Sequence, residues 1–349
     1  MAATEGVNDI TIVGGGIAGL SLGVALLNRG IPVRLQEASF FPRHRVCGEF
    51  ISGVSGETLQ ALGVRDLLND AELLRSTNWY DRSGPVLSAT LPEPALGISR
   101  YRLDRRMAER LVDKGGELIE GERFRIRKEE EPTQGLVLAT GRPVRTESDW
   151  IGLKAHFPGL PLEADLEMHL GEDGYLGLSR IEDGRVNACG LFRKRDDVSA
   201  KGEEALATYV EACGLDRLAR RLRESGADSD SCTGVSAFVF GAQDRARESA
   251  FCIGDRGSII PPFTGNGMSM AFQSAELAFP LLAAYSRGES EWLDALVQYQ
   301  KRASSKFRRR LAISRWMHPI LSRPIGQSML SSLSRKHLLP FGMIYRATR

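Results

Sequence analysis

The N-terminal part of the chain combines two apolar runs with a helical pattern between them. Residues 9–13 and 32–36 read as strands, and a glycine-rich turn leads into apolar positions at helical spacing over 20–29. This order predicts a βαβ unit. Two further short apolar segments, 136–141 and 250–255, contain glycine at or near their ends, and we expect them to return to the same nucleotide-binding sheet.

The middle of the chain follows the period of two that is typical of half-buried strands. Residues 76–100 alternate in this way, and residues 182–184 form a turn between two alternating runs that fits a hairpin. The strands expected beyond this point are 150–157, 167–170, 175–180, 185–192 and 236–240. Helical patterns occur at 57–68, 104–114, 201–224 and 268–279 and over most of the C-terminal part.

These patterns predict an α/β protein, with a Rossmann-like domain, an inserted antiparallel-sheet substrate domain and a C-terminal helical segment. The Rossmann-like domain is expected to be discontinuous. We assign 1–75, 101–149 and 245–290 to this domain, 76–100 and 150–244 to the substrate domain, and 291–349 to the helical segment.

Composition excludes several classes of protein. The 46 Lys and Arg balance 44 Asp and Glu, which argues against a general nucleic-acid binder. The five cysteines are odd in number, far apart and without a Cys-x-x-Cys pair, so neither a disulfide framework nor a metal site is predicted. No signal peptide or membrane-spanning apolar run is present, and we expect a cytoplasmic protein with reduced thiols.

Charge is unevenly distributed along the chain. Residues 301–349 contain twelve Lys and Arg and no Asp or Glu, which leaves 34 Lys and Arg against 44 Asp and Glu in the remainder. Apolar residues at helical spacing lie between these cations, and Pro319 is expected to kink the helix. Such a segment is typical of one that binds an anionic membrane surface or an acidic carrier protein. The alternative is that its apolar face packs on the Rossmann-like domain and its arginines are solvated.

The glycine-rich turn has the spacing of a dinucleotide-binding motif. Gly14, Gly16 and Gly19 follow a strand and open a helix, where a helix N-terminus faces a pyrophosphate. Glu37 ends the next strand, where a carboxylate accepts hydrogen bonds from ribose hydroxyls. A second element, residues 253–268, would place a carboxylate and a helix N-terminus beside a flavin, which an enzyme using only NAD does not need.

The combination of these motifs resembles a known family. Gly14-x-Gly16-x-x-Gly19 with Glu37, the stretch 100–104, and Gly254-Asp255 followed by 261–267 are similar to the FAD-dependent aromatic hydroxylase superfamily, the group A flavoprotein monooxygenases. Within it, residues 41–49 most resemble the geranylgeranyl reductase branch. The resemblance covers about residues 8–285.

The resemblance implies FAD as cofactor, with NAD(P)H as the expected electron donor, and it assigns roles to matching residues. Gly14, Gly16, Gly19 and Glu37 would bind the ADP half, and Arg100 would lie along the FAD chain. The remaining cofactor-binding residues would be Arg45, Asp255, Pro262, Gly265, Asn266, Gly267 and Met268. Cys47, in the Cys-Gly pair, is the candidate catalytic residue beside the flavin; the alternative is a small loop residue that packs under the cofactor.

The implied function is a flavin-dependent oxidoreductase or monooxygenase that acts on a hydrophobic small molecule, such as a phenol, a quinone, a polyketide-type compound or an isoprenoid. One alternative is a geranylgeranyl reductase-like enzyme that reduces carbon-carbon double bonds, although the aromatic signature of those reductases is absent at 174–180. The tryptophan signature of flavin halogenases is absent as well. A non-catalytic flavin-binding or interaction protein is the alternative of another class.

The histidines form no readable catalytic set in the sequence. His44 and His156 are 112 positions apart, and each isolated histidine is expected to be structural or exposed. Lys154 and His156 alternate with apolar residues and therefore share one face of a strand. That face either points into the substrate cavity or, as we expect, meets solvent.

Overall fold

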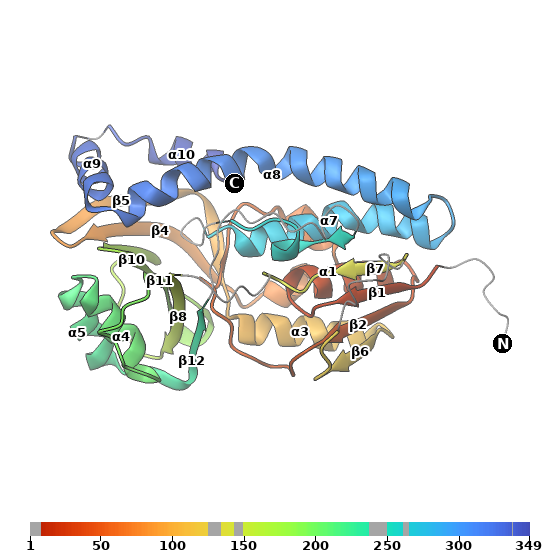
Figure 1. Ribbon diagram of the computed structural model, residues 1–349, viewed down its shortest axis with the longest axis horizontal. Helices are drawn as coiled ribbons and strands as arrows, with labels where there is room; N and C mark the ends of the chain where they lie inside the picture. The colour runs from red at the N-terminus through yellow and green to blue at the C-terminus, as the bar shows by residue number, and fades with distance from the viewer. Residues whose placement is uncertain (1–7, 125–133, 143–148, 237–249, 261–264, 337) are drawn as a thin grey trace.

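The computed structural model describes residues 8–124, 134–142, 149–236, 250–260, 265–336 and 338–349. Its strands form two sheets, one of five strands and one of eight. The two sheets occupy opposite ends of the molecule's long axis, and the long helix α8 (Trp292–Ser322) runs beside both (Figure 1). The α/β architecture predicted from the sequence is therefore confirmed.

The five-stranded sheet is parallel and contains the predicted βαβ unit. Helix α1 (Ile17–Leu27) connects β1 (Ile10–Val13) to β2 (Val33–Glu37), and the two strands pair in parallel. The strand order is β13 (Phe251–Cys252), β7 (Leu136–Leu138), β1, β2 and β6 (Glu117–Glu120). Both later segments predicted to return to this sheet do so, as β7 and β13, whereas β6 has no counterpart in the prediction.

Helix α1 is buried on almost every side because helices cover it as well as the sheet. It packs against α3 (Arg100–Asp113) and α7 (Gly267–Ser286). Leu20, Leu22 and Leu26 are buried with Phe272 in the largest core cluster. This core fixes the N-terminal ends of α1 and α7 relative to the parallel strands, which positions the glycine-rich turn.

The eight-stranded sheet is antiparallel except between β4 and β9, which pair in parallel. The predicted hairpin at 182–184 joins β10 (Gly174–Arg180) to β11 (Val186–Arg193). The other strands are β3 (Phe50–Ile51), β4 (Glu72–Asp81), β5 (Gly84–Gly97), β8 (Trp150–Phe157), β9 (Leu166–Gly171) and β12 (Asp228–Ser236).

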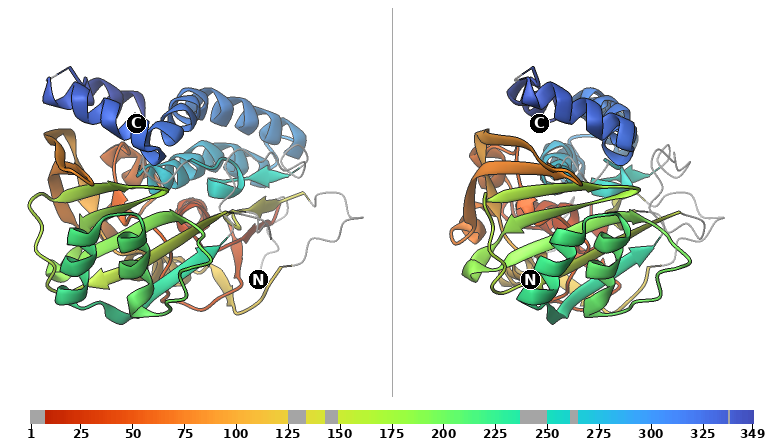
Figure 2. Two further views of the ribbon diagram at one scale, coloured as in Figure 1. Left: turned by 60° about the vertical axis from the view of Figure 1, so that its left-hand side comes forward. Right: turned by 90° about the vertical axis from the view of Figure 1, so that its left-hand side faces the viewer.

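Two helices cover one face of this sheet. The helical pattern predicted over 201–224 forms α4 (Glu203–Ala212) and α5 (Asp216–Ser225), which lie against the sheet (Figure 2). Leu153, Ala155 and Phe157 of β8 are buried in a core cluster with Leu206 and Val210 of α4. Alternate residues of β8 therefore point to the opposite face, away from these helices.

Several predicted boundaries differ from the structure for local reasons. The helix predicted over 57–68 is divided into α2 (Gly56–Ala61) and a 3-10 turn, η1 (Arg65–Leu68), because Gly63 adopts a left-handed φ of 70° that ends the first helix. Helix α3 begins before the predicted residue 104, since the Ser99 hydroxyl caps it by accepting from the backbone N–H of Arg102. The strand predicted at 236–240 lies mostly outside the described residues, and β12 ends at Ser236.

The C-terminal part is helical, as predicted. Helix α8 continues to Ser322, and α9 (Pro324–Arg335) and α10 (Phe341–Ala347) follow it. The α8 assignment is continuous through Pro319, so the expected kink does not break the helix there. Helix α9 contacts β5 and α10 contacts β5 and α8, and the C-terminus lies above α7 (Figure 1).

Candidate functional site

The glycine-rich turn closes tightly between β1 and α1. A Cβ on Gly19 would lie 2.0 Å from the Gly14 carbonyl oxygen, and a Cβ on Gly14, whose φ is 112°, would lie 2.3 Å from the carbonyl oxygen of Ala139. Neither position accepts a side chain. At Gly16, by contrast, a Cβ would have no protein atom closer than 3.9 Å, the nearest being a guanidinium nitrogen of Arg100. The turn therefore leaves the backbone at the α1 N-terminus approachable by a ligand.

Glu37 lies beside this turn, as its position at the end of β2 predicted. Its Oε2 atom accepts a hydrogen bond of 2.6 Å from the Gly15 backbone N–H, and Oε1 accepts one of 3.0 Å from the N–H of Ser39. Arg43 forms an ion pair of 2.9 Å with the same carboxylate. Glu37 is buried, and it connects the turn to the loop that follows β2.

Three arginines gather over the turn around two carboxylates. Arg100 makes two hydrogen bonds of 2.7 Å to Asp104, and Arg45 lies 3.7 Å from Glu37 and 4.0 Å from Asp104. Burial, together with repulsion by Arg100 and Arg43, lowers the pKa of Arg45 to about 10. Positive charge is therefore in excess here, an arrangement that favours an anion.

Some of the arginine donors at this place are buried and have no hydrogen-bond acceptor among the described residues. They are the Nε and Nη1 atoms of Arg43 and the Nε atom of Arg45. Leaving charged donors unpaired in the interior is costly, so such atoms indicate a missing acceptor. A diphosphate supplies the oxygen atoms that guanidinium groups bind.

Asp255 lies close to the same turn. It belongs to a short 3-10 turn, η3 (Gly254–Arg256), which contacts both α1 and α7. A Cβ on Gly254 would lie 2.9 Å from the Cβ of Ala18 in the first turn of α1. The Asp255 carboxylate is partly exposed and pairs with Arg142 at 3.4 Å. The structure thus brings this predicted residue to the glycine-rich turn from a distant part of the sequence.

The N-terminus of α7 forms the other end of the candidate site. Asn266 does not cap the helix with its side chain, and its Nδ2 atom donates to the carbonyl oxygen of Thr348 at 2.7 Å. Its Oδ1 atom is buried and has no hydrogen-bond partner among the described residues. Gly267 faces open space, since a Cβ there would meet no atom within 4 Å, and Met268 is buried behind it. Pro262 lies outside the described residues.

The loop that contains Cys47 connects this helix end to the large sheet. Phe50 packs directly on Gly265, where a Cβ would lie 1.9 Å from the ring, and the Ser52 backbone N–H donates to the hydroxyl of Ser269 at 3.2 Å. On the sheet side, the Cys47 carbonyl oxygen accepts from the Asn187 side chain at 3.0 Å. Burial raises the pKa of the Cys47 thiol although Arg100 opposes this, so the protonated thiol is favoured at neutral pH.

A buried ionic group under this loop was not predicted from the sequence. Glu49 is fully buried, and its carboxylate lies 3.3 Å from Lys154 Nζ and 2.6 Å from His156 Nε2. The backbone N–H of Arg100 also donates to it, at 3.0 Å. Burial alone would raise the pKa of Glu49, but Lys154 and His156 outweigh it and lower that pKa. The carboxylate is therefore held ionised in the interior.

The expectation that Lys154 and His156 meet solvent is wrong. The two side chains do share a face of β8, but they are only 1% and 2% exposed. The loop from residue 44 to residue 49 covers that face, while α4 covers the other, and the sequence alone does not show which face of an antiparallel sheet is covered. The sequence did contain a signal for this burial. Lys154 and His156 are cationic residues on an otherwise apolar strand, and the loop motif contains an acid, Glu49, that can pair with them.

His44 extends this group toward the surface. Its Nδ1 atom accepts from Lys154 Nζ at 3.0 Å, and its ring stacks on Tyr101 with the centroids 4.6 Å apart. Burial and the positive charge of Lys154 lower the pKa of His44 to about 4. His44 and His156, far apart in the sequence, thus lie in one cluster with ring centroids 5.1 Å apart.

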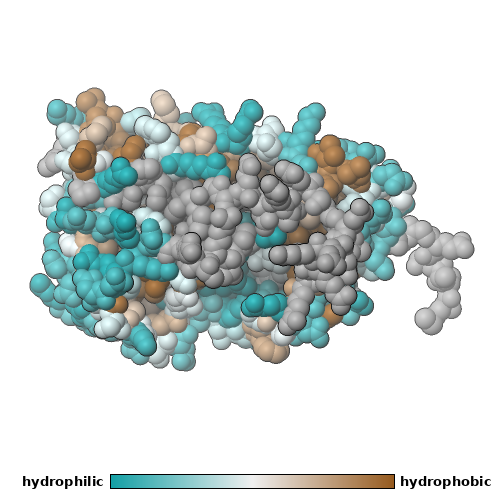
Figure 3. Space-filling model, viewed as in Figure 1, coloured by the Kyte–Doolittle hydropathy of each residue, from teal (hydrophilic) through white to brown (hydrophobic). Residues whose placement is uncertain are grey.

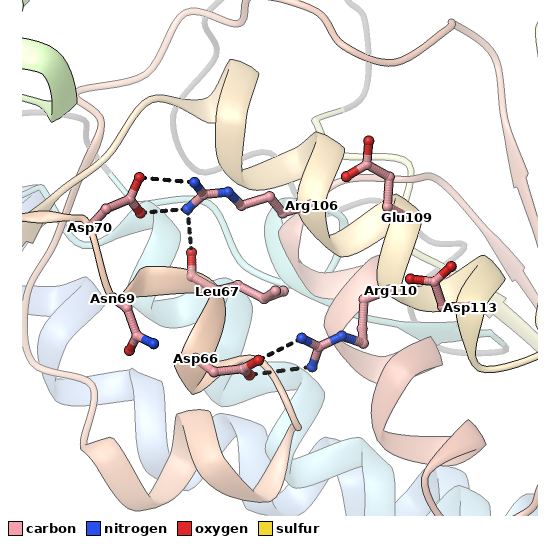
Figure 4. A pocket seen from close by; sticks show the side chains of 8 residues that line it. All are labelled: Asp66, Leu67, Asn69, Asp70, Arg106, Glu109, Arg110 and Asp113. Atoms are coloured by element: carbon pink, nitrogen blue, oxygen red, sulfur yellow. Dashed lines mark hydrogen bonds and ion pairs between the residues drawn. The ribbon is translucent and has the colours of Figure 1, made fainter.

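A surface hollow between η1 and α3 lies away from these residues. Arg106 and Arg110 reach across it to Asp70 and Asp66 and satisfy their charges there (Figure 4). These two pairs account for both arginines of the hollow, and we interpret it as a structural ion-pair network. In the described part of the chain, no cluster of His, Cys, Asp or Glu is arranged to hold a metal ion.

The sequence was compared with family models and with curated proteins. No family model matches the sequence. The chain is 23% identical to a flavin-dependent halogenase, armH2 of Armillaria mellea, over 87% of this chain and 71% of that protein. It is 35% identical over 72 residues to squalene epoxidase erg1 of Aspergillus fumigatus, but that match spans only 21% of this chain and 15% of the epoxidase.

Solved structures match over nearly the whole chain. The flavin-dependent brominase Bmp2 matches with a TM-score of 0.75 at 16% identity, covering 98% of this chain and 93% of that one. Klebsiella pneumoniae HpxO, solved with FAD and uric acid, gives 0.74 at 17% identity over 97% of both chains. PqsL of Pseudomonas aeruginosa, in complex with 2-aminobenzoylacetate, gives 0.72 at 16% identity over 93% of this chain and 100% of that one. This chain therefore has the fold of these flavin-dependent and FAD-binding proteins.

Proposed function

We propose that this chain is an FAD-dependent oxidoreductase, and specifically a monooxygenase of a small hydrophobic ring compound such as a phenol or a quinone. The observation that carries the proposal is the group of buried arginine donors of Arg43 and Arg45, over the glycine-rich turn, that have no hydrogen-bond acceptor among the described residues. The fold supports it, because two of the solved relatives hold small organic molecules, uric acid and 2-aminobenzoylacetate.

The residues present fit FAD at both ends of the candidate site. At one end, Arg43, Arg45 and Arg100 would hold the diphosphate, and Glu37 and Asp255 supply carboxylates for sugar or ribityl hydroxyls. At the other end, the N–H groups of the first turn of α7 and the buried Oδ1 of Asn266 are available to the flavin ring. When bound, FAD would supply the transfer of electrons from NAD(P)H to oxygen.

The protein's own contribution is to bind the cofactor, to orient its ring and to exclude water from the site. The N-terminus of α7 carries partial positive charge, which stabilises negative charge on a ring placed before it. Glu49 ties the loop around Cys47 to Lys154 and His156 of the sheet, and so fixes that loop between the α7 end and the sheet. His44, with its pKa lowered to about 4, is neutral at pH 7 and accepts rather than donates at Nδ1. The arrangement favours a dry, rigid site.

Reduction of carbon-carbon double bonds is the second candidate function. The placement of Cys47 between α7 and the large sheet, in a Cys-Gly pair, is the observation that favours it. The relatives named above include a squalene epoxidase and two halogenating enzymes but no double-bond reductase, which supports oxygen chemistry over this alternative. A non-catalytic flavin-binding protein has no specific observation in its favour.

The first test is cofactor binding. Purified protein reconstituted with FAD should show flavin absorbance near ~450 nm, and Arg45→Gln should bind FAD at least about tenfold more weakly, because a charge-assisted contact is lost. Arg34→Gln is the matched control, since Arg34 lies on β2 but pairs with Glu117 at an exposed position. Protein that cannot be reconstituted with FAD contradicts the proposal.

The second test separates oxygen transfer from reduction. The reduced, FAD-loaded enzyme is incubated with candidate phenols, quinones and isoprenoids, with and without oxygen, and products are measured by mass spectrometry. A monooxygenase adds one oxygen atom only in the presence of oxygen, whereas a reductase adds two hydrogen atoms in either condition. Addition of hydrogen alone would establish the reductase alternative.

A further inference from the structure

The C-terminal helices expose large apolar side chains to water, where their exposure is unfavourable. Six such residues of this part are between 38% and 79% exposed. We call them the tail surface: Trp316 of α8, Ile325, Met329 and Leu333 of α9, Leu338, and Met343 of α10. Figure 3 shows hydrophobic residues gathered at the upper left of the molecule, where Figure 1 places α9. Large exposed apolar side chains that gather on one part of a surface indicate an interaction site.

Helix α9 packs Leu330 against the core cluster of Leu170 and Tyr175 but leaves other apolar side chains exposed. Ile325, Met329 and Leu333 recur every four residues and form an exposed stripe. Its polar Gln327 and Ser331 are buried instead, and the Gln327 side chain donates to the carbonyl oxygens of Gly171 at 2.7 Å and Leu321 at 2.9 Å. Polar hydrogen bonds thus anchor α9 to the body of the protein, so the orientation of the helix is fixed with its apolar stripe outward.

Exposed cations flank α9 at both ends. Arg323 precedes α9 and Lys336 follows it, both exposed, and Arg315 is exposed beside Trp316. The segment 301–349 has twelve Lys and Arg and no Asp or Glu of its own, although Lys306 pairs with Glu276 at 3.8 Å and Arg310 is buried. An apolar helix face with basic ends and an exposed tryptophan matches the boundary between lipid headgroups and acyl chains.

We propose that the tail surface binds an anionic lipid membrane, with α9 lying in the plane of the interface. A second copy of this chain fits the surface less well, because a symmetric contact would bring two cationic segments together. Within the described ranges, no helix combines the length and the apolarity needed to cross a bilayer. The attachment is therefore peripheral, through buried apolar area and attraction between cations and anionic headgroups.

The experiment measures co-sedimentation of the full chain with lipid vesicles. Vesicles of phosphatidylcholine alone are compared with vesicles that contain about 30% phosphatidylglycerol, at low and at high salt. The full chain should bind only the anionic vesicles, and less at high salt. The triple variant Ile325→Ser, Met329→Ser, Leu333→Ser and the triple variant Arg315→Gln, Arg323→Gln, Lys336→Gln should each bind at least about tenfold more weakly.

A matched control removes exposed apolar residues elsewhere. Leu293→Ser with Val297→Ser changes two exposed positions at the opposite end of α8 and should leave binding unchanged. Unfolding midpoints equal to that of the unaltered chain show that the variants are folded. The proposal is overturned if the unaltered chain binds no anionic vesicles. It is also overturned if the serine triple variant binds them as well as the unaltered chain. A dimer that the serine variant converts to a monomer, without vesicle binding, would assign the surface to self-association instead.

Discussion

Glu49 Oε2 accepts a 2.6 Å hydrogen bond from Nε2 of His156, a residue 107 positions away, and both side chains are buried. The backbone of Glu49 adopts a left-handed φ of 54°, which a side-chain-bearing residue rarely takes. The surrounding contacts hold it there, since the Ile98 backbone N–H donates to the Glu49 carbonyl oxygen at 3.0 Å. This relationship joins the loop at the candidate cofactor site to the large sheet.

We predict that Glu49→Gln destabilises the protein by about 3 kcal/mol, because it leaves the ammonium group of Lys154 buried without its carboxylate. Urea unfolding measures the change. The control is Glu109→Gln, which removes an exposed partner of Arg105 on α3 and should cost less than about 0.5 kcal/mol. Equal effects of the two substitutions would show that the buried pair adds nothing to stability.

Stability should fall as pH is lowered from 6.5 toward 4, in part through His44. Its pKa is 6.5 when unperturbed and about 4 in the folded protein. Between these values the unfolded chain takes up a proton that the folded chain does not, so unfolding becomes more favourable. Thermal midpoints measured at pH 7 and pH 4.5 should therefore differ less in His44→Gln than in the unaltered chain. Parallel pH profiles for the two proteins would contradict this assignment.

Alanine substitutions at Gly265 and Gly267 should affect different properties of the protein. Gly265 has a φ of 63° and packs on Phe50, so Gly265→Ala should destabilise the protein by more than about 1 kcal/mol. Gly267 faces open space, so Gly267→Ala should fold normally but weaken FAD binding by blocking approach to the α7 N-terminus. Thermal unfolding and FAD titration together distinguish the two. Unchanged FAD affinity in Gly267→Ala would place the flavin elsewhere.

Substitution of Cys47 tests whether the thiol contributes to the reaction or to packing. Cys47→Ser should lower turnover several-fold while FAD content stays constant, because burial holds the group as a neutral thiol beside Arg100. Cys47→Ala provides the comparison, since it removes the polar atom but keeps a small side chain. An equal loss of turnover and FAD content in both variants would indicate a packing role.

The sequence by itself determined the parts of the protein that depend on neighbouring residues. The spacing of Gly14, Gly16 and Gly19 specifies the turn between β1 and α1, because the close backbone approaches there exclude side chains. Alternating runs indicated β8, β10 and β11 and the hairpin between the last two, since strand period and turn chemistry are local properties. The boundary of α3 was missed because its cap, Ser99, lies five residues before the predicted start.

Only the tertiary structure decided which faces are covered and which charges meet. Alternation placed Lys154 and His156 on one face, but the loop with Glu49 buries that face, and the two segments are more than a hundred positions apart. The exposure of the apolar stripe of α9 likewise depends on the hydrogen bond from Gln327 to the carbonyl oxygen of Gly171, 156 positions away. Burial and ion pairing at such separations depend on how the elements pack, and residue patterns along the chain do not record this packing.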